Sequence, residues 1–158
     1  MGEVLTLDEV ARRRVASKIL GRRFVFTNGC FDLLHPGHTE LLRRAKALGH
    51  YLCVGVNSDR SVRTLKGEGR PVQGEQARAT VVAALASVDY VVLFDEDTPL
   101  RLIQTLLPDI LVKGGDYTPA TIVGRAEVEG AGGKVHVIPL IAGFSSSQIA
   151  QRIRQTTG

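Results

Sequence analysis

The sequence has no tryptophan and few other aromatic residues, which together make up only 5% of its 158 residues. Proteins that hold single-stranded nucleic acid combine aromatic stacking platforms with a concentrated basic groove. Here the net charge is +4, and the basic residues are scattered along the chain or paired with acidic ones. We therefore expect no nucleic-acid partner, whereas a modest positive charge suits a small phosphorylated ligand.

Cysteines and long apolar runs are also scarce. Cys30 and Cys53 have neither the spacing of metal ligands nor the density of a disulfide framework. No apolar stretch approaches the roughly 20 residues that a membrane helix needs. The N-terminal residues carry charges where a secretory signal would need its apolar core. These absences predict a cytoplasmic protein with reduced thiols and no membrane association.

The familiar nucleotide-binding motifs are missing as well. The sequence contains no G-x-x-x-x-G-K-[ST] motif, so it is not a P-loop protein. Gly67 and Gly69 lack the third glycine of a dinucleotide fingerprint and do not lie in a strand-to-helix turn. Any nucleotide must be held in another way.

What the sequence does contain is a regular alternation of apolar strands and helices. Five short runs rich in β-branched residues are separated by amphipathic helical segments, and they lie at residues 24–27, 51–56, 90–94, 110–112 and 135–138. This pattern predicts one α/β domain over residues 1–158, with a Rossmann-like, doubly wound, five-stranded parallel sheet and helices on both faces. Ligands of such sheets bind at the carboxyl ends of the strands, where the strand order reverses.

The first 21 residues are expected to form an N-terminal helical arm. Thr6 and Glu9 have the spacing of a capping box, and the helix should run to about Leu20. The apolar residues at helical spacing predict one buried face, made of Leu7, Ala11, Val15 and Ile19.

The segment "HPGH" follows the first predicted strand and holds two of the four histidines. Pro36 suits the first position of a helix, which places His35 and His38 on one side of its start. Gly37 allows a ligand to approach the backbone, and the free N–H groups of a helix start attract phosphate. Two histidines can also bind zinc, but the only nearby third ligand is Asp32. The pattern favours an anion site, and we expect no protein-bound metal.

A second possible anion site lies near the C-terminus, in "GFSSSQIAQRI". Ser145 can cap a helix, and Ser146 and Ser147 add hydroxyl groups beside the free N–H groups of its first turn. Taken alone, a serine run is simply a good helix cap. The interpretation as an anion site is favoured because this would be the second helix start in the chain with such anion-binding groups.

Two loops add charge to this picture. In "VKGGDY", Lys113 supplies a cation, Gly114 and Gly115 permit close backbone approach, and Asp116 can accept hydrogen bonds from a sugar or an amine. In "LKGEGRPVQG", the cations of Lys66 and Arg70, flanking two glycines, could close over phosphate groups as a lid does. Each loop could equally be a solvated polar turn.

These segments together carry a resemblance to a known superfamily. In chain order, "NGCFDLLHPGH", "VGVNSD", "GRPV", "VDYVVLFDEDTP", "KGGDY" and "GFSSSQI" resemble the nucleotidyltransferases with an HxGH motif, which include cytidylyltransferases and phosphopantetheine adenylyltransferase. The resemblance runs from about residue 22 to the end of the chain. "FDEDTP" and "KGGDYTPATIVG" are similar to the branch that adenylylates heptose 1-phosphates. Ala86 and Leu140-Ile141 replace arginine-containing positions of the glycerol-phosphate-type cytidylyltransferases and weaken that alternative.

The resemblance implies a reaction and its partners. AMP would pass from ATP to D-glycero-β-D-manno-heptose 1-phosphate, giving ADP-heptose and pyrophosphate for lipopolysaccharide core synthesis. Mg²⁺ would be bound through the substrate phosphates. The protein would be a homodimer, and the heptose kinase of the same pathway would be a separate protein.

The resemblance also assigns roles to residues. The catalytic group would be His35, His38 and Lys66. The nucleotide would contact Thr27, Asn28, Gly29, Cys30, Phe31, Gly37, Arg70, Lys113, Gly114, Gly115, Phe144, Ser145, Ser146 and Ser147. The sugar phosphate would contact Asp32 and Asp116. Three alternatives remain open: another phosphorylated acceptor such as glycerol 3-phosphate, phosphoethanolamine or phosphopantetheine; CTP as the donor; or a non-catalytic nucleotide-binding module, against which the two histidines and the basic loop argue.

Overall fold

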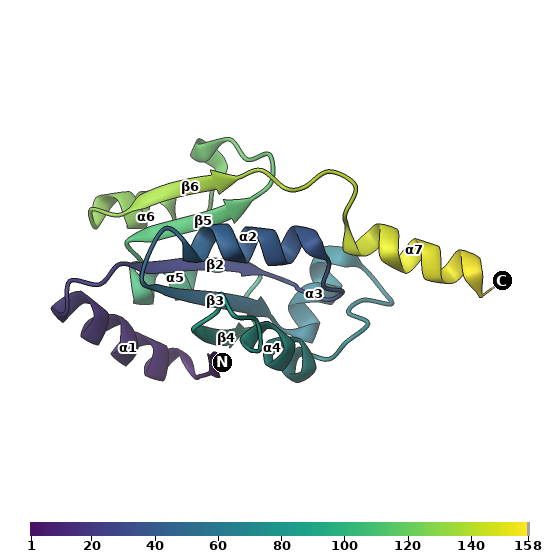
Figure 1. The fold of residues 1–158 in the computed structure, drawn as a ribbon, viewed down its shortest axis with the longest axis horizontal. Coiled ribbons are helices and arrows are strands. Elements are labelled where there is room, and N and C mark those ends of the chain that lie inside the picture. Colours follow the sequence, from purple (N-terminus) through teal and green to yellow (C-terminus); the bar gives the residue numbers. More distant parts are fainter. Residues whose placement is uncertain (158) are drawn as a thin grey trace.

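The computed structural model describes residues 1–157, which form one parallel sheet with helices on both faces (Figure 1). The strands are β1 (Glu3–Val4), β2 (Phe24–Gly29), β3 (Tyr51–Asn57), β4 (Tyr90–Phe94), β5 (Ile110–Gly114) and β6 (Lys134–Ile138). Their order across the sheet is β1-β4-β3-β2-β5-β6, and every neighbouring pair is parallel. The predicted α/β class is confirmed, with six strands in place of five.

The helices divide into two layers. They are α1 (Leu7–Ile19), α2 (Pro36–Lys46), α3 (Asp59–Lys66), α4 (Glu75–Ala83), α5 (Leu100–Leu106), α6 (Arg125–Gly130) and α7 (Ser146–Thr156), with the short 3-10 helix η1 (Pro119–Thr121). One core cluster joins α2 and α4 to the sheet through residues such as Leu42 and Val82. The other joins α1, α5 and α6 to the opposite face through Val10, Ile103 and Val128. The sheet is therefore doubly wound, as the alternation of strands and helices predicted.

The sixth strand, β1, was not predicted. It contains only Glu3 and Val4, both exposed, so it leaves no apolar run in the sequence. It forms because β4 offers a free edge, to which Glu3 pairs opposite Tyr90. Strand formation here depends on a partner that is remote in the sequence, and local pattern cannot reveal it.

The buried face predicted for α1 is only half right, because Leu7 and Ala11 pack half-buried against the core whereas the other two predicted residues do not. The capping box of Thr6 and Glu9 is present, but Val15 and Ile19 point into solvent, with exposed fractions of 60% and 79%. The buried face holds Val10, Arg14 and Ser17. Arg14 makes two 2.9 Å contacts with the carboxylate of Asp109 and also donates to the carbonyls that end α5. This bidentate ion pair, which is charge-assisted and geometrically specific, sets the rotation of α1 against the sheet.

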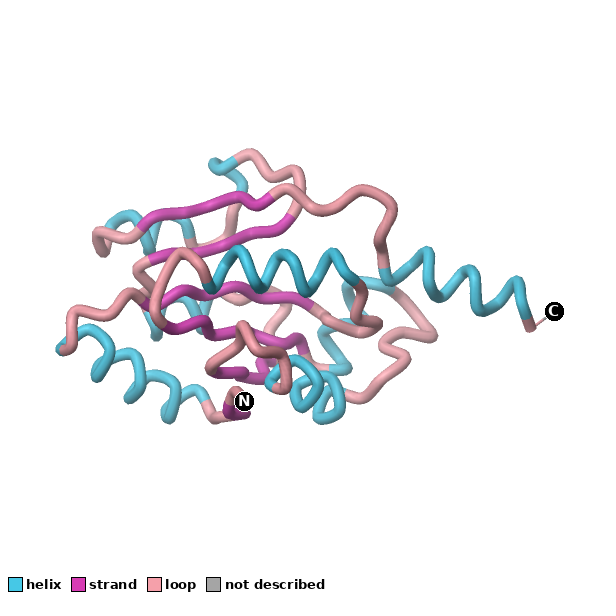
Figure 2. Tube along the Cα trace, in the orientation of Figure 1, coloured by secondary structure: helices cyan, strands magenta, loops and turns pink. Residues whose placement is uncertain are grey.

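The strand order reverses between β2 and β5. The chain proceeds outward from β2 to β3 and β4, and then returns to place β5 on the other side of β2. The strand arrows point toward the side from which α7 projects (Figure 1), and Figure 2 shows that loops gather on that side. This is the edge at which an open parallel sheet binds its ligands. Within residues 1–157, no helix has the length and apolar character needed to span a membrane.

Candidate active site

The start of α2 lies at this edge and carries His35 and His38. His35 is the N-cap residue of α2, and its Nδ1 accepts a 3.1 Å hydrogen bond from the amide of Gly37. In a neutral imidazole the other nitrogen, Nε2, must then carry the proton and can donate to a ligand. A Cβ on Gly37 would lie 2.9 Å from the His35 ring. Gly37 is therefore required here to leave room for the histidine cap.

His38 is held by ring contacts. Its ring stacks on His35, with centroids 3.9 Å apart, and packs at 5.3 Å against Phe31. Phe31 is buried and has a φ of +49°, a left-handed conformation that is rare for a bulky residue. A side chain on Gly29 would strike the Phe31 ring at 3.0 Å. Such backbone strain is held by the surrounding structure, and here it sets the wall against which His38 rests.

Both histidines are neutral near pH 7. Burial, together with the smaller effects of the neighbouring His35 and Lys66 charges, lowers the pKa of His38 to about 4. The pKa of His35 is lowered in the same direction, first by burial and then by Lys66. The Nδ1 atom of His38 is buried and has no hydrogen-bond partner among the described residues. The pair can thus donate N–H groups to an anion without the cost of burying an imidazolium ion.

The second predicted corner, at the start of α7, lies beside the first. A cavity of about 220 Å³ is lined from both helices by Leu34, His35, Pro36, Gly143, Phe144, Ser145, Gln148, Ile149 and Arg152. Ser145 is the N-cap and accepts from the amide of Gln148, while Ser146 donates to the carbonyl of Leu33 and so fastens α7 to the loop before α2. Ser147 is exposed. Two helix N-termini converge on one cavity, an arrangement suited to phosphate groups.

Arg152 is a cation of this cavity that the sequence analysis missed. It lies one turn beyond Gln148, and side chains on a helix lean toward its N-terminus. Arg152 accordingly lines the same cavity as Ser145 and His35. The spacing of Arg152 from the serine run, read with this lean, could have identified it.

A larger cleft of about 350 Å³ opens on the other side of the β2 end. It is lined by Asn28, Gly29, Cys30, Asn57, Leu65, Asp97, Thr98, Pro99, Lys113, Tyr117, Thr121, Ile122 and Val123. Lys113 Nζ donates a 2.8 Å hydrogen bond to Asn28 Oδ1 and lies 6.0 Å from the centre of the Tyr117 ring. The ends of β2, β3 and β5 all contribute to this cleft. Asn57, Asp97, Thr98 and Tyr117 were not predicted as site residues, because only the fold brings them together.

Asp32 and Arg70 form a buried ion pair. Arg70 Nε lies 2.7 Å from Asp32 Oδ2, and the exposed fractions of the two side chains are 10% and 0%. The Asp32 carboxylate also accepts from the amides of Val72 and Gln73. The pKa of Asp32 is lowered because these amides and Arg70 outweigh burial, the largest single influence, which acts to raise it. Its oxygens are thus already engaged, so it offers little to a zinc ion or to a sugar.

Arg78 is a fully buried residue that the sequence analysis did not single out. It donates to the carbonyl of Cys30 at 2.6 Å, to the carbonyl of Gln73 at 2.9 Å and to the carboxylate of Asp59 at 2.7 Å. One side chain therefore joins the loop after β2, the loop before α4 and the start of α3.

Burial raises the pKa of the Cys30 thiol, which keeps it protonated.

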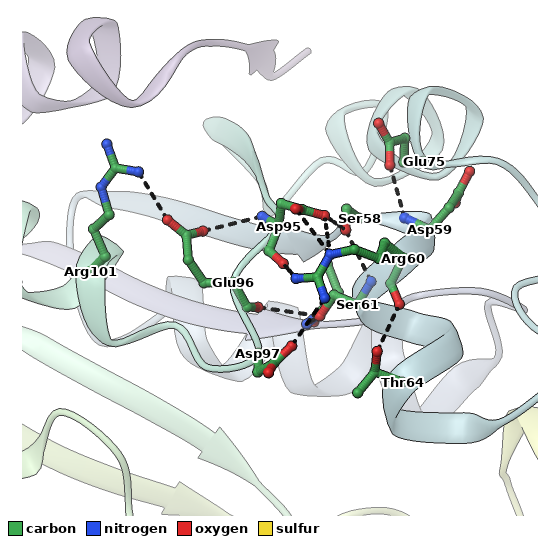
Figure 3. A network of polar contacts seen from close by, with 11 residues as sticks. Ser58, Asp59, Arg60, Ser61, Thr64, Glu75, Asp95, Glu96, Asp97 and Arg101 are labelled. Atoms are coloured by element: carbon green, nitrogen blue, oxygen red, sulfur yellow. Dashed lines mark hydrogen bonds and ion pairs between the residues drawn. The ribbon is translucent and has the colours of Figure 1, made fainter.

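A polar network holds the loop that forms one wall of the cleft (Figure 3). Arg60 contacts the carboxylates of Asp95 at 3.0 Å and Asp97 at 3.4 Å, and it also donates to the carbonyl of Asp95. The hydroxyl of Ser58 donates to the same Asp95 carboxylate. The start of α3 thereby fixes the end of β4, and Asp97 follows directly in the cleft wall.

Several predicted residues have other surroundings than expected. Thr27 is buried, and its hydroxyl donates to the carbonyl of Val112, so it ties β2 to β5. Gly114 lies against the sheet core, where a Cβ would come within 2.8 Å of Leu41. Asp116 is exposed, as is Lys66 at the end of α3. The Lys66 charge nevertheless reaches the site, since it lowers the pKa of both histidines.

Comparison with known proteins places these features in a family. Residues 26–152 match the model of the cytidylyltransferase-like family. The chain is 54% identical over 152 residues to the bifunctional protein HldE of Geotalea uraniireducens, and 58% identical over 145 residues to that of Syntrophotalea carbinolica. These alignments cover 96% and 92% of the chain but only 31% and 28% of the relatives. The chain thus spans about a third of the length of the curated relatives it matches.

Two solved structures have the same fold. A lipopolysaccharide core biosynthesis protein from Thermoplasma volcanium has a TM-score of 0.62 and 27% identity, over 77% of this chain and 98% of its own. A pantoate-β-alanine ligase from Francisella tularensis has a TM-score of 0.65 at 15% identity, over 98% of this chain and 78% of its own, and supports the fold alone. With a family model that covers most of its length and relatives identical at more than half of the aligned positions, the chain belongs to the cytidylyltransferase-like family of nucleotidyltransferases, as its HPGH motif predicted.

Proposed function

We propose that this domain transfers AMP from ATP to D-glycero-β-D-manno-heptose 1-phosphate, releasing pyrophosphate and forming ADP-heptose for lipopolysaccharide core synthesis. The observation that carries the proposal is the stacked, neutral pair of His35 and His38 at the start of α2, beside the start of α7. The relatives named HldE and the core biosynthesis protein support the choice of a heptose substrate.

In this proposal, each of the two cavities binds one of the two substrates. We place the triphosphate in the corner between α2 and α7, where helix N-termini, Ser145 and Arg152 favour negative charge. We place the sugar 1-phosphate in the cleft at the ends of β2, β3 and β5. The ring of His38 contacts His35 of the corner and Phe31, the residue after Cys30 of the cleft, and we place the meeting of the α-phosphorus and the acceptor phosphate there.

The reaction needs little proton transfer. An oxygen of the sugar 1-phosphate, already an anion, forms a bond to the α-phosphorus of ATP, while the bond to the bridging oxygen breaks and pyrophosphate leaves with the electron pair. No general base is required. Catalysis then comes from positioning and from donors aimed at the charge that develops on the α-phosphate oxygens. We assign that role to the N–H groups of His35 and His38.

The remaining cations take supporting roles in the proposal. Lys66 lies close enough to the histidines to affect their pKa and would neutralise the β and γ phosphates. Arg70 is held by Asp32, and its Nη2 is buried without a partner among the described residues, so it can donate to a phosphate that enters the site. Asp32 thereby acts as a positioning residue for Arg70. Asp116 stays a candidate for contact with the sugar.

We expect Mg²⁺ to arrive as part of the MgATP substrate, bound to phosphate oxygens. Within residues 1–157, no three His, Cys, Asp or Glu side chains cluster as a metal site. Asp97, which lines the cleft, is engaged by Arg60, and Asp32, in the loop before α2, is engaged by Arg70. These residues fit an ion carried by the substrate.

Four further expectations stay predictions: a homodimer, a separate heptose kinase, a cytoplasmic location and no nucleic-acid partner. The single-domain organisation of residues 1–158 is likewise proposed. These expectations concern the organisation and partners of the protein and not the geometry of the site.

The test is pyrophosphate release from ATP or CTP with Mg²⁺ and each of three acceptors: the heptose 1-phosphate, a hexose 1-phosphate and glycerol 3-phosphate. Release with ATP and the heptose alone is the expected result. Release only with CTP or another acceptor would keep the mechanism and overturn the substrate, and no release at all would favour a nucleotide-binding module.

The same assay tests the histidines. His38→Ala should lower turnover about a hundredfold or more, the scale of one transition-state donor. His136→Ala is the matched control, because His136 is exposed on the edge strand β6, outside both cavities. Near-normal turnover in folded His38→Ala would contradict the mechanism.

A further inference from the structure

Lys113 is a cation in the cleft without an anionic partner. Its ammonium group is partly buried at the end of β5, and its hydrogen-bond acceptor is the neutral oxygen Oδ1 of Asn28 at 2.8 Å. Among residues 1–157, no carboxylate forms an ion pair with it, and Asp97, the acidic residue that lines the cleft, pairs with Arg60. Burial of an unpaired charge is unfavourable. Such a charge is stabilised when an anion enters the cleft.

The cleft contains a single basic lining residue in the described part of the chain, and it is Lys113. The corner between α2 and α7 shares no lining residue with it and has its own cation, Arg152. A nucleotide bound in the corner therefore does not need Lys113 for its phosphates. A phosphorylated acceptor in the cleft has no other ammonium or guanidinium group lining it.

The neighbours of Lys113 suit a sugar. Asn28 and Thr98 offer an amide and a hydroxyl group that can exchange hydrogen bonds with sugar hydroxyls, and Tyr117 offers a ring face. The amide of Asn57 and the hydroxyl of Thr121 already donate to Ser61 and to the carbonyl of Thr118, so they shape the cleft wall. Asn28 also fixes the position of the ammonium group at the end of β2. From there the chain passes through Gly29 and Cys30 directly to Phe31, whose ring touches His38.

We propose that Lys113 is the residue that binds the phosphate of the acceptor, in place of the nucleotide contact that its loop motif predicted. This inference rests on the proposed function and adds to it the cation that selects a phosphorylated sugar. Asn28 holds the ammonium group before the acceptor binds, and the acceptor phosphate then takes the open side of the same group. Lys113 thus neutralises the charge of the acceptor phosphate, the group that also supplies the attacking oxygen.

The test compares Lys113→Met with the same change at Lys134. Lys134 is exposed at the opposite, amino-terminal end of the neighbouring strand β6 and lies in neither cavity. With the heptose 1-phosphate varied at saturating MgATP, Lys113→Met should raise the KM for the acceptor about tenfold to a hundredfold, the scale of a lost charge-assisted hydrogen bond. The KM for ATP should change less than about twofold, and Lys113→Arg should restore part of the loss because it keeps the charge.

A rise in the KM for ATP, or an unchanged KM for both substrates, would overturn the proposal. If the wild-type chain releases no pyrophosphate with any acceptor, the proposed function fails, and the inference is then tested by binding alone. The probe is inorganic phosphate, followed through the side-chain amide NMR signals of Asn28. Binding that is lost in Lys113→Met supports the role of Lys113, and equal binding in both proteins refutes it.

Discussion

Replacing Arg78 by methionine should destabilise the whole site. The Arg78 side chain is fully buried and donates to Cys30, Gln73 and Asp59, which lie in three different segments. Removing one partner of a buried ion pair costs about 3–5 kcal/mol. Because the Asp59 side chain keeps 32% of its exposure and can be hydrated, we expect the lower end, about 3 kcal/mol.

Thermal unfolding followed by circular dichroism measures this loss. For a chain of this size, 1 kcal/mol corresponds to about 2–4 °C in Tm, so Arg78→Met should unfold about 6–12 °C below the wild type. Arg101→Met is the matched control. Arg101 also pairs with an acid, Glu96, but its side chain is 72% exposed, and exposed pairs contribute only about 0–1 kcal/mol.

The functional part of the prediction is measured below the lowered Tm, where the variant is folded. The carbonyl of Cys30 lies one residue before Phe31, whose ring supports His38. Release of that carbonyl should therefore reduce kcat as well as stability. The reasoning is refuted if Arg78→Met and Arg101→Met unfold at the same temperature.

Two other predictions concern the histidines. The pKa of His38 falls from an ordinary 6.5 to about 4 on folding, so between these pH values the unfolded chain binds a proton that the folded chain does not. His38 therefore costs the fold no stability above pH 6.5 but up to about 3 kcal/mol as the pH falls toward 4. Urea unfolding at pH 7 and pH 4.5 should show a smaller pH dependence for His38→Asn than for the wild type, and equal dependence would contradict the shifted pKa. In Gly37→Ala, the new Cβ would meet the His35 ring at 2.9 Å, whereas alanine favours the helix by about 1 kcal/mol. The expected result is a turnover at least about tenfold lower, since a misplaced donor loses its transition-state contact, with an unchanged or raised Tm; unchanged turnover would show that the ring can move without loss.

Much of the fold followed from local pattern. Short β-branched runs alternating with amphipathic helices predicted the parallel sheet, because strands buried on both faces must be apolar along their whole length. The caps Thr6 and Ser145, and Pro36 at a first helical position, predicted where three helices start, since helix ends follow local rules for their free N–H groups. The anion corner of His35 and Ser145 was foreseeable for the same reason.

Other features depended on partners remote in the sequence. The two-residue strand β1 exists only because β4 leaves an edge free. The rotation of α1 was decided by the ion pair between Arg14 and Asp109, against the apolar spacing that favoured Val15. In both cases a long-range contact outweighs a weak local preference.

The sequence by itself determined the chemistry available: two histidines at a helix start, serines at another and a lysine after a strand. Tertiary structure alone decided what each group faces. It engaged Asp32 with Arg70, joined two loops and the start of α3 through Arg78, and left Lys113 in the cleft with only the amide oxygen of Asn28. The physical reason is that burial and charge pairing are properties of neighbours in space, and they fix which polar groups are already satisfied and which await a ligand.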